Sequence, residues 1–154
     1  MFHIVILFLI TLCVQGERHL LCSSEMSEIW YSYSGGFDEV SATISPCFYS
    51  RLTQFSIKYK AIPRFDMVNI YYNFYMVYEN HKVLEMSGSV CDEAIEDLTI
   101  CGILKGETIS QEISVYTGPY ELSQGTYEAV IKIFHMGNNM QEPLFTSNAT
   151  VSIK

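Results

Sequence analysis

Strict alternation of apolar and polar residues marks the stretch Phe55-Ser56-Ile57-Lys58-Tyr59-Lys60-Ala61. Because successive side chains of a β-strand point to opposite faces, this pattern predicts a strand with one face in a core and the other in water. Residues 40–45, 112–115 and 127–133 alternate in the same way. The run 70–78 is apolar or aromatic on both faces, which predicts a strand in the middle of a sheet or one covered on its outer side.

Glycine and proline fall between the predicted strands, notably at 35–36, 62–64, 118–119 and 125. Short strands interrupted at this spacing are typical of a sandwich of two antiparallel sheets. We therefore predict one all-β domain, an immunoglobulin-like two-sheet antiparallel sandwich. The eleven tyrosines and nine phenylalanines fit a tightly packed core as well as they fit sheets held apart around an apolar ligand.

The first sixteen residues predict a secretory signal peptide. They contain no lysine, arginine, aspartate or glutamate, and an apolar run from Ile4 to Val14 ends at Gln15-Gly16. Such a run followed by a small residue is typical of a leader and its cleavage site. A buried strand or helix is the alternative, whereas a membrane-spanning helix needs about twenty apolar residues. We expect a signal peptide at 1–16, one domain at 17–154, and a secreted, extracellular protein.

Four cysteines remain after the predicted leader, which removes Cys13. They are Cys22, Cys47, Cys91 and Cys101. An even number in an exported chain favours two disulfides with three possible pairings, of which the two local ones are the simplest. Zinc is the alternative, but the spacings are wider than those of zinc knuckles and no histidine lies near a cysteine pair. We expect no metal and no cofactor.

The charge of the chain argues against two classes of partner. With a net charge of −8 and only nine basic residues, it lacks the basic face of a nucleic-acid binder. It also has no basic cluster for an anionic membrane, and no later segment long enough to span one. Asn148-Ala149-Thr150 is a permitted N-glycosylation sequon, which predicts a surface position for Asn148.

Catalytic motifs are missing from the sequence, so we predict that the protein is not an enzyme. Ser87-Gly88-Ser89 lacks the frame of a nucleophile elbow. His81 and His135 fall between the predicted strands, where solvated loop residues are expected. Four acids crowd residues 92–97, and we interpret them as a solvated loop or a docking patch for a basic partner rather than an acid–base pair.

Several motifs together resemble those of the ML (lipid-recognition) family, over the chain from Cys22 to about Phe145. They are Ser45-Pro46-Cys47, Ile62-Pro63-Arg64-Phe65-Asp66 followed by the aromatic run 70–75, Cys91-(x)9-Cys101-x-x-Leu104-Lys105-Gly106-Glu107, and Ser123-x-Gly125-x-Tyr127. The resemblance is greatest to members that serve as co-receptors of Toll-like receptors. It implies a β-sandwich with a deep apolar pocket between its sheets, which takes the acyl chains of a lipid.

The resemblance also implies two sets of site residues. The inward-facing pocket positions are Ile29, Ile44, Phe48, Ile57, Tyr59, Ile70, Tyr72, Phe74, Met76, Ile100, Ile113, Val115, Leu122, Tyr127 and Ile131. The receptor-docking positions are Arg64, Asp66, Glu96, Asp97, Lys105 and Glu107.

Two departures from the family pattern stand out. A third family disulfide is replaced by Ser34 and Thr146, so both of its cysteines are absent together. The family's co-receptor for lipopolysaccharide has a basic pocket mouth, and none of the matching positions here is basic. They are Gln54, Met86, Asp92, Gly118, Glu121, Gln124 and Glu128. Acidic side chains at a rim oppose an anionic head group.

These observations predict a secreted co-receptor that binds a lipid with several acyl chains and docks on a Toll-like receptor ectodomain. Its role would lie in innate immune recognition of lipopolysaccharide or a related lipid. One alternative keeps the fold but pairs the protein with a homologue of that receptor and a neutral or zwitterionic lipid. Another is a soluble lipid carrier that has no receptor.

Overall fold

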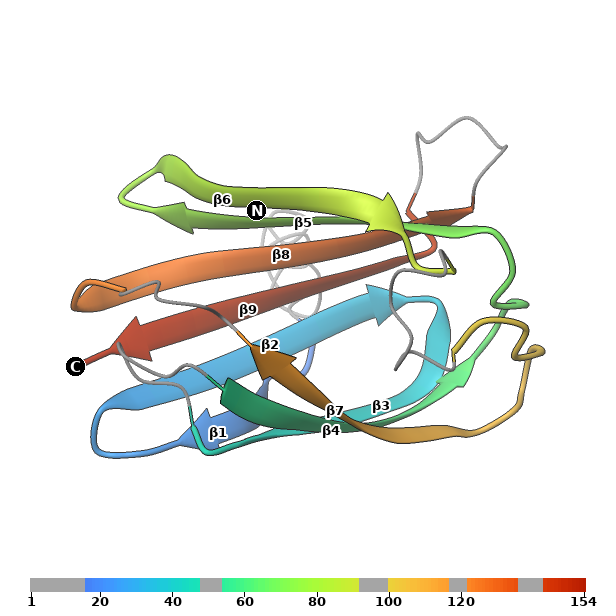
Figure 1. Ribbon diagram of the computed structural model, residues 1–154, viewed down its shortest axis with the longest axis horizontal. Helices are drawn as coiled ribbons and strands as arrows, with labels where there is room; N and C mark the ends of the chain where they lie inside the picture. Colours follow the sequence, from blue (N-terminus) through green and yellow to red (C-terminus); the bar gives the residue numbers. More distant parts are fainter. Residues whose placement is uncertain (1–15, 48–53, 92–99, 117–121, 136–142) are drawn as a thin grey trace, which may run out of the picture.

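The computed structural model describes residues 16–47, 54–91, 100–116, 122–135 and 143–154 (Figure 1). The predicted leader therefore lies almost entirely outside the described residues. The strands are β1 (His19–Ser23), β2 (Ser27–Gly35), β3 (Phe37–Ser45), β4 (Gln54–Pro63), β5 (Ile70–Tyr78), β6 (His81–Ser89), β7 (Ile109–Tyr116), β8 (Gly125–His135) and β9 (Phe145–Ile153). In this part of the chain no helix has the length and hydrophobicity needed to cross a membrane.

The strands form two sheets, and every pairing is antiparallel. One sheet has six strands in the order β1-β2-β9-β8-β5-β6, and the other has three in the order β3-β4-β7. The predicted all-β, two-sheet sandwich is therefore confirmed. Figure 1 shows the three-stranded sheet lying across the lower half of the six-stranded one, with β6 at the opposite edge.

The alternating stretch that predicted a strand is β4, the central strand of the smaller sheet. Ile57 pairs with Ile44 of β3 on one side and with Ile113 of β7 on the other, while Lys58 and Lys60 are exposed. The aromatic run 70–78 is β5, which lies between β8 and β6, as its two apolar faces predicted.

The two histidines expected in loops lie instead at strand ends. His81 is the first residue of β6 and His135 is the last residue of β8. A tight turn at Glu79 and Asn80, both with positive φ, joins β5 to β6. A β-bulge in this hairpin leaves Val83 as an extra residue in β6. This bulge breaks the period of two, so β6 could not be recognised from alternation.

Both predicted local disulfides are confirmed. Cys22–Cys47 joins β1 to the residues just after β3, with a Cα–Cα distance of 5.4 Å. Because β1 and β3 are edge strands of different sheets and also contact each other, this side of the sandwich is closed. Cys91–Cys101 closes the loop between β6 and β7, with a Cα–Cα distance of 5.5 Å.

The buried core is divided into two clusters at opposite ends of the strands. One contains Phe37, Ala61, Met67, Ile109 and Phe145. The other contains Ile29, Tyr127, Val151 and Ile153. The first gathers where β3, β7 and β9 begin, and the second gathers where β2 and β8 begin and β9 ends.

Candidate functional site

The middle of the sandwich, between the two buried clusters, is lined by predicted pocket residues. Ile44, Ile57 and Ile113 form one cross-strand row on the inner face of the smaller sheet. Phe74 pairs with Ile131 on the inner face of the larger sheet. All five are only half-buried, although they face the opposite sheet. Inward side chains of a packed sandwich interdigitate and lose nearly all contact with solvent. Here the side chains in the apolar middle remain partly accessible to solvent.

The remaining predicted pocket residues divide between the ends and the middle. Ile29 and Tyr127, at 4 and 3% exposure, belong to the buried cluster at one end, and Ile70, the first residue of β5, is 0% exposed. The half-buried ones are Tyr59, Tyr72, Met76, Ile100, Val115 and Leu122. Met76 and Leu122 pack against the cluster around Tyr127, and Tyr59 and Ile100 pack against the cluster around Phe37. Phe48 lies outside the described residues.

The polar groups of the interior are satisfied by neighbouring side chains or backbone. Tyr59 Oη donates to Gln111 Oε1 at 2.6 Å, and burial raises the pKa of the Tyr59 phenol. Tyr127 Oη donates to the Ser123 carbonyl oxygen at 3.0 Å. Burial also raises the pKa of Tyr31, against a smaller opposing effect of a backbone hydrogen bond at Ala42. The interior therefore offers an apolar surface with its few hydroxyls already occupied.

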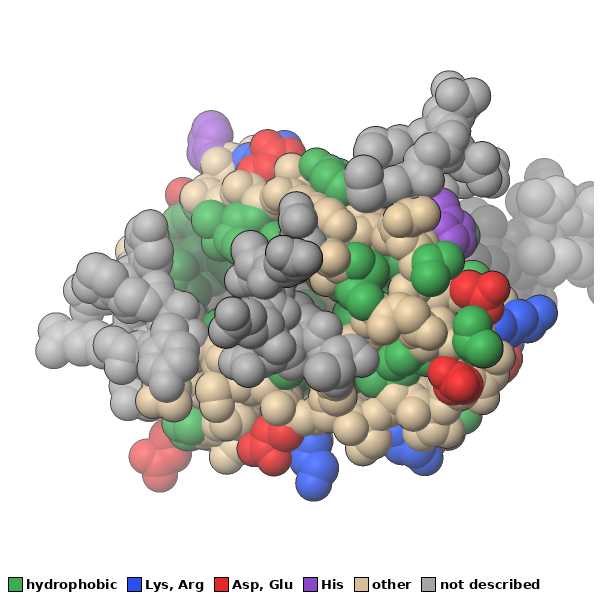
Figure 2. Space-filling model, turned by 45° about the vertical axis from the view of Figure 1, so that its right-hand side comes forward, with side chains coloured by type: hydrophobic (Ala, Val, Ile, Leu, Met, Phe, Trp, Pro, Cys, Tyr) green, Lys and Arg blue, Asp and Glu red, His purple; other side chains and the backbone are tan. Residues whose placement is uncertain are grey.

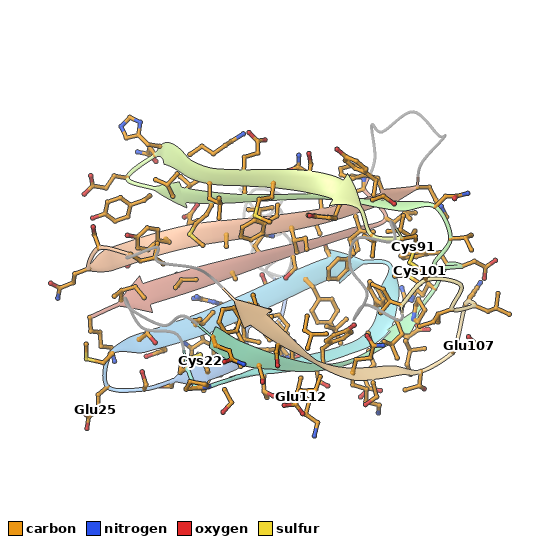
Figure 3. The ribbon with its side chains drawn as sticks, viewed as in Figure 1. Cys22, Glu25, Cys91, Cys101, Glu107 and Glu112 are labelled. Atoms are coloured by element: carbon orange, nitrogen blue, oxygen red, sulfur yellow. A yellow bond between two sulfur atoms is a disulfide. The ribbon has the colours of Figure 1, made fainter. Side chains whose placement is uncertain are left out.

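The β6 edge exposes the apolar surface to solvent. Val83, Leu84 and Met86 are 50, 42 and 49% exposed, which is unusual for large apolar side chains on neighbouring positions of one strand. Leu84 and Met86 pair with Met76 and Phe74, so they continue the inner face of β5 toward this edge. Figure 1 shows β6 and β7 apart, as edge strands of the two sheets, and Figure 3 shows side chains between them. Figure 2 shows hydrophobic side chains among polar ones on the face that it draws.

The exposed rim carries little charge. Gln54, Met86 and Gln124 are exposed and none is basic. Glu128 lies on the outer face of the larger sheet, because it follows inward-facing Tyr127 and pairs with Thr150 and Val77, so it does not contribute to the rim. The other rim positions, Asp92, Gly118 and Glu121, lie outside the described residues.

The predicted docking edge consists of two segments held together by hydrogen bonds. The Met67 N–H donates to the Ile103 carbonyl at 2.8 Å, and the Gly106 N–H donates to the Pro63 carbonyl at 2.8 Å. The Lys105 N–H donates to Asp66 Oδ1 at 2.9 Å. Met67, at 2% exposure, anchors this platform in the core. We call residues 63–68 and 101–107 the two-segment platform.

Predicted docking residues have different roles in the two-segment platform. The Asp66 carboxylate holds the Lys105 amide, and the Glu107 carboxylate accepts the Leu104 N–H at 2.9 Å, so both acids shape the backbone. Arg64 forms an exposed ion pair with Asp38. The Lys105 side chain is exposed. Glu96 and Asp97 lie outside the described residues.

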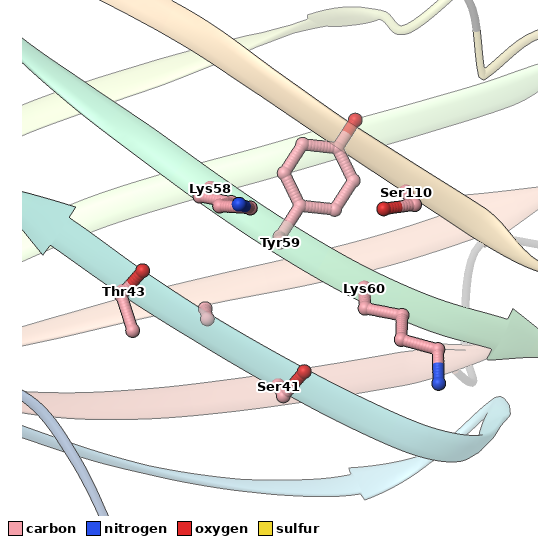
Figure 4. Close-up of a pocket in the computed structure, with 7 residues that line it drawn as sticks. Ser41, Thr43, Lys58, Tyr59, Lys60 and Ser110 are labelled. Carbon is pink, nitrogen blue, oxygen red and sulfur yellow. The ribbon is translucent and has the colours of Figure 1, made fainter.

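Sequence reasoning missed a shallow hollow on the outer face of the smaller sheet (Figure 4). It has a volume of about 290 Å³ and is lined by Ser41, Ala42, Thr43, Lys58, Tyr59, Lys60 and Ser110. Lys60 is 3.6 Å from Glu39, so the face is polar and partly charge-balanced. The alternation that turns Lys58 and Lys60 outward was the available signal. Elsewhere in the described chain, no group of three or more His, Cys, Asp or Glu could hold a metal ion.

These features define a class: a β-sandwich linked by a disulfide along one side, whose apolar middle is partly accessible to solvent. No family model matches the chain. It is 26% identical to lymphocyte antigen 96 of Bos taurus over 136 residues, covering 88% of this chain and 84% of that protein. It is 21% identical to lymphocyte antigen 86 of Homo sapiens over 133 residues, covering 86 and 80%.

A solved structure has the same fold. The crystal structure of chicken MD-1 complexed with lipid IVa superposes with a TM-score of 0.72 at 21% identity, covering 90% of this chain and 99% of that one. The resemblance to the ML family predicted from the sequence is therefore confirmed, with lymphocyte antigens 96 and 86 among its relatives.

Proposed function

We propose that this protein is a secreted, lipid-binding co-receptor that carries acyl chains between its sheets and docks on the ectodomain of a Toll-like receptor. The observation that carries the proposal is the half-buried apolar middle between two fully buried ends. The complex of the structural relative MD-1 with lipid IVa supports acylated lipid as the class of ligand. An apolar space of this kind is costly to leave empty.

The energetics favour long chains over a small apolar solute. Each methylene transferred from water contributes about 0.8 kcal/mol, so an acyl chain of about a dozen carbons contributes on the order of 10 kcal/mol before ordering costs. The row Ile44–Ile57–Ile113 and the facing Phe74 and Ile131 supply the apolar walls. The exposed β6 side chains lie where a ligand enters.

A space-filling substitution tests the lipid site directly. In Ile57→Trp, the larger ring extends into the middle of the sandwich. We expect thermal stability close to that of the wild type and a clear loss of co-purifying lipid in native mass spectrometry. Ile29→Trp is the matched control, because Ile29 lies in a closed end, where overpacking costs about 1–3 kcal/mol. If Ile57→Trp destabilises the protein as much as Ile29→Trp does, the middle is packed and the lipid site is wrong.

The head group is the second question. The described rim has no basic residue at Gln54, Met86 or Gln124, so it offers no cation to a phosphate. This favours the alternative of a neutral or zwitterionic lipid and a partner related to that of lymphocyte antigen 86. Competition between lipid A and a phosphatidylcholine for the delipidated protein discriminates the two. Preference for lipid A in low salt would restore lipopolysaccharide as the ligand.

Receptor docking is assigned to the two-segment platform. Arg64 and Lys105 provide exposed cations, and Val68 and Leu104 provide exposed apolar side chains at 45 and 54%. An apolar centre with a charged rim is the arrangement found in protein interfaces. The hydrogen bonds of Asp66 and Glu107 hold this surface in one conformation, which lowers the ordering cost of binding.

Charge reversal tests this edge. We expect Lys105→Glu to weaken binding to a Toll-like receptor ectodomain at least about tenfold in surface plasmon resonance, mainly through electrostatic complementarity. Lys60→Glu, on the outer face of the smaller sheet, is the control with the same charge change. A wild-type protein that retains lipid but binds no receptor ectodomain would identify a soluble carrier instead.

A further inference from the structure

A glutamine interrupts the apolar inner face of the smaller sheet. Gln111 of β7 pairs with Tyr59 of β4, and the Tyr59 ring packs against the buried cluster around Phe37. Because directly opposed residues of neighbouring strands turn their side chains to the same face, the Gln111 side chain points inward as well. Its neighbours on this face of β7 are Ile109 and Ile113, two residues away on either side. An amide therefore lies on an otherwise aliphatic strand face.

Tyr59 holds this amide in one orientation. Tyr59 Oη donates to Gln111 Oε1 at 2.6 Å, and Figure 4 shows the Tyr59 ring extending from β4 toward β7. Burial raises the pKa of the Tyr59 phenol, so the hydroxyl stays protonated and continues to donate at neutral pH. A glutamine amide has one acceptor oxygen and two N–H donors on its nitrogen. Since the oxygen is occupied, the Nε2 donors are the part of Gln111 that can bind another molecule.

These donors can be reached from outside the protein. Gln111 is half-buried, and its Nε2 donates to no residue of the described chain. In the same part of the chain, no buried side-chain nitrogen or oxygen lacks a hydrogen-bond partner, so this nitrogen keeps contact with solvent. A ligand that covers it has to replace that water. A hydrocarbon chain cannot do so, and a donor buried without an acceptor costs more free energy than a hydrogen bond usually contributes.

The place of Gln111 in the sheet indicates which part of a ligand would meet it. β7 is an edge strand of the three-stranded sheet. Ile109 is buried at 3% exposure, whereas Ile113 belongs to the half-buried row of the apolar middle. The amide thus lies at the margin of the sheet, between a buried end and the apolar middle. In an acyl lipid, the acceptor next to the apolar chain is the carbonyl oxygen of the ester or amide linkage.

We propose that the Gln111 amide, held by Tyr59, donates a hydrogen bond to the ester or amide carbonyl of a bound acyl lipid. This inference rests on the proposed function and narrows its ligand to lipids whose chains are attached through a carbonyl. Gln111 is the binding residue and Tyr59 is a positioning residue. The donor is neutral, so it suits a carbonyl without requiring a phosphate at the rim.

The test compares two probes that share a head group and chain length. The delipidated protein is incubated with equal amounts of a short-chain diacyl phosphatidylcholine and its dialkyl ether analogue, in which each ester carbonyl is a methylene. Native mass spectrometry gives the ratio of the two bound lipids. We expect the wild type to prefer the ester roughly fivefold, the effect of one hydrogen bond. Equal binding, or preference for the ether, overturns the inference and leaves the lipid site in place. Binding of neither probe overturns the proposed function as well.

Variants assign the preference to the amide. Gln111→Met keeps the length of the side chain but removes its donors, so the ratio should fall to near unity with ether binding unchanged. Gln54→Met makes the same change at an exposed glutamine of β4 and should keep the wild-type ratio, because both probes present the same head group there.

Tyr59→Phe separates positioning from a general structural defect. It should lower the ester preference part of the way and leave binding of the ether analogue unchanged, whereas a distorted site would weaken both probes. A Gln111→Met protein that retains the wild-type preference overturns the assignment to Gln111. Equal weakening of both probes by Tyr59→Phe overturns the positioning role.

Discussion

Replacing Ser34 and Thr146 together by cysteine should create a third disulfide between β2 and β9. The two residues are register partners in the structure, although 112 positions separate their numbers. Opposed residues of antiparallel strands have Cα atoms about 4.5–5.5 Å apart, which lies within the range that a disulfide tolerates. The family resemblance places an absent disulfide at these two positions, and their direct pairing in the structure supports that match of the sequence to the family pattern.

The stabilisation follows from the length of chain that the new bond would close. A loop of about a hundred residues corresponds to about 4.7 kcal/mol in the chain-entropy treatment, and engineered bonds usually deliver less, so we expect about 2–4 kcal/mol. For a domain of this size each kcal/mol raises Tm by about 3 °C, which gives an increase of about 6–12 °C. Differential scanning calorimetry, with and without reductant, measures it.

A shifted pair provides the control for register. Ser32 pairs with Asn148, so Ser32→Cys combined with Thr146→Cys places the two thiols on a diagonal, about 7–8 Å apart, where bridging is disfavoured. Peptide mapping without reduction identifies which pair oxidises. Efficient oxidation of the shifted pair, with free thiols in the Ser34/Thr146 variant, would refute the register on which the reasoning rests.

Four further changes have expected outcomes. Gly125→Ala should lower stability by about 1–3 kcal/mol in urea unfolding, because Gly125 has φ +146° and a Cβ there would meet Tyr78 Cε2 at 2.6 Å; wild-type stability would contradict the close packing. Tyr127→Phe should cost about 1–2 kcal/mol, since the hydroxyl of buried Tyr127 donates to the Ser123 carbonyl, whereas Tyr78→Phe, which removes a longer and exposed hydrogen bond, should cost less. Asp66→Ala should increase hydrogen exchange at the Lys105 amide and leave the Gly125 amide unchanged, because only the former loses its acceptor. Burial raises the pKa values of Tyr31 and half-buried Tyr59 above 10.0, so the stability that their neutral phenols contribute is complete below pH 10 and is lost as the pH rises beyond it; Tyr59→Phe should reduce that alkaline loss, and an unchanged pH profile would contradict it.

Much of the fold could be predicted because strand periodicity is local information. Phe55–Ala61 alternates without interruption, so its strand and its inner face could both be read directly from the sequence. Residues His81–Ser89 show the opposite case. The bulge at Val83 brings Lys82 and Glu85, three residues apart, within 2.9 Å of each other as an ion pair. On a regular strand these two side chains would point to opposite faces, so alternation alone does not predict the pair.

The candidate site divides in a similar way. Inward positions such as Ile57 and Ile113 follow from alternation and from the family resemblance together. The difference between buried Ile29 and half-buried Ile57 does not, because it depends on how far apart the sheets stand. Nor could the sequence show that Asp66 and Glu107 bond to backbone amides, since both are ordinary charged residues until the two segments meet.

The disulfide between Cys22 and Cys47 fixes the two sheets to each other along one edge of the sandwich. Two sheets joined along one edge separate most at the opposite edge. A small rotation about the joined edge would therefore change the distance between β6 and β7 more than the distance between β1 and β3. If the proposed function is right, lipids of different width would be accommodated mainly near β6 and β7, without repacking β1 against β3. Reduction of the Cys22–Cys47 disulfide would remove this constraint, so the relative position of the two sheets would then depend on the ligand between them.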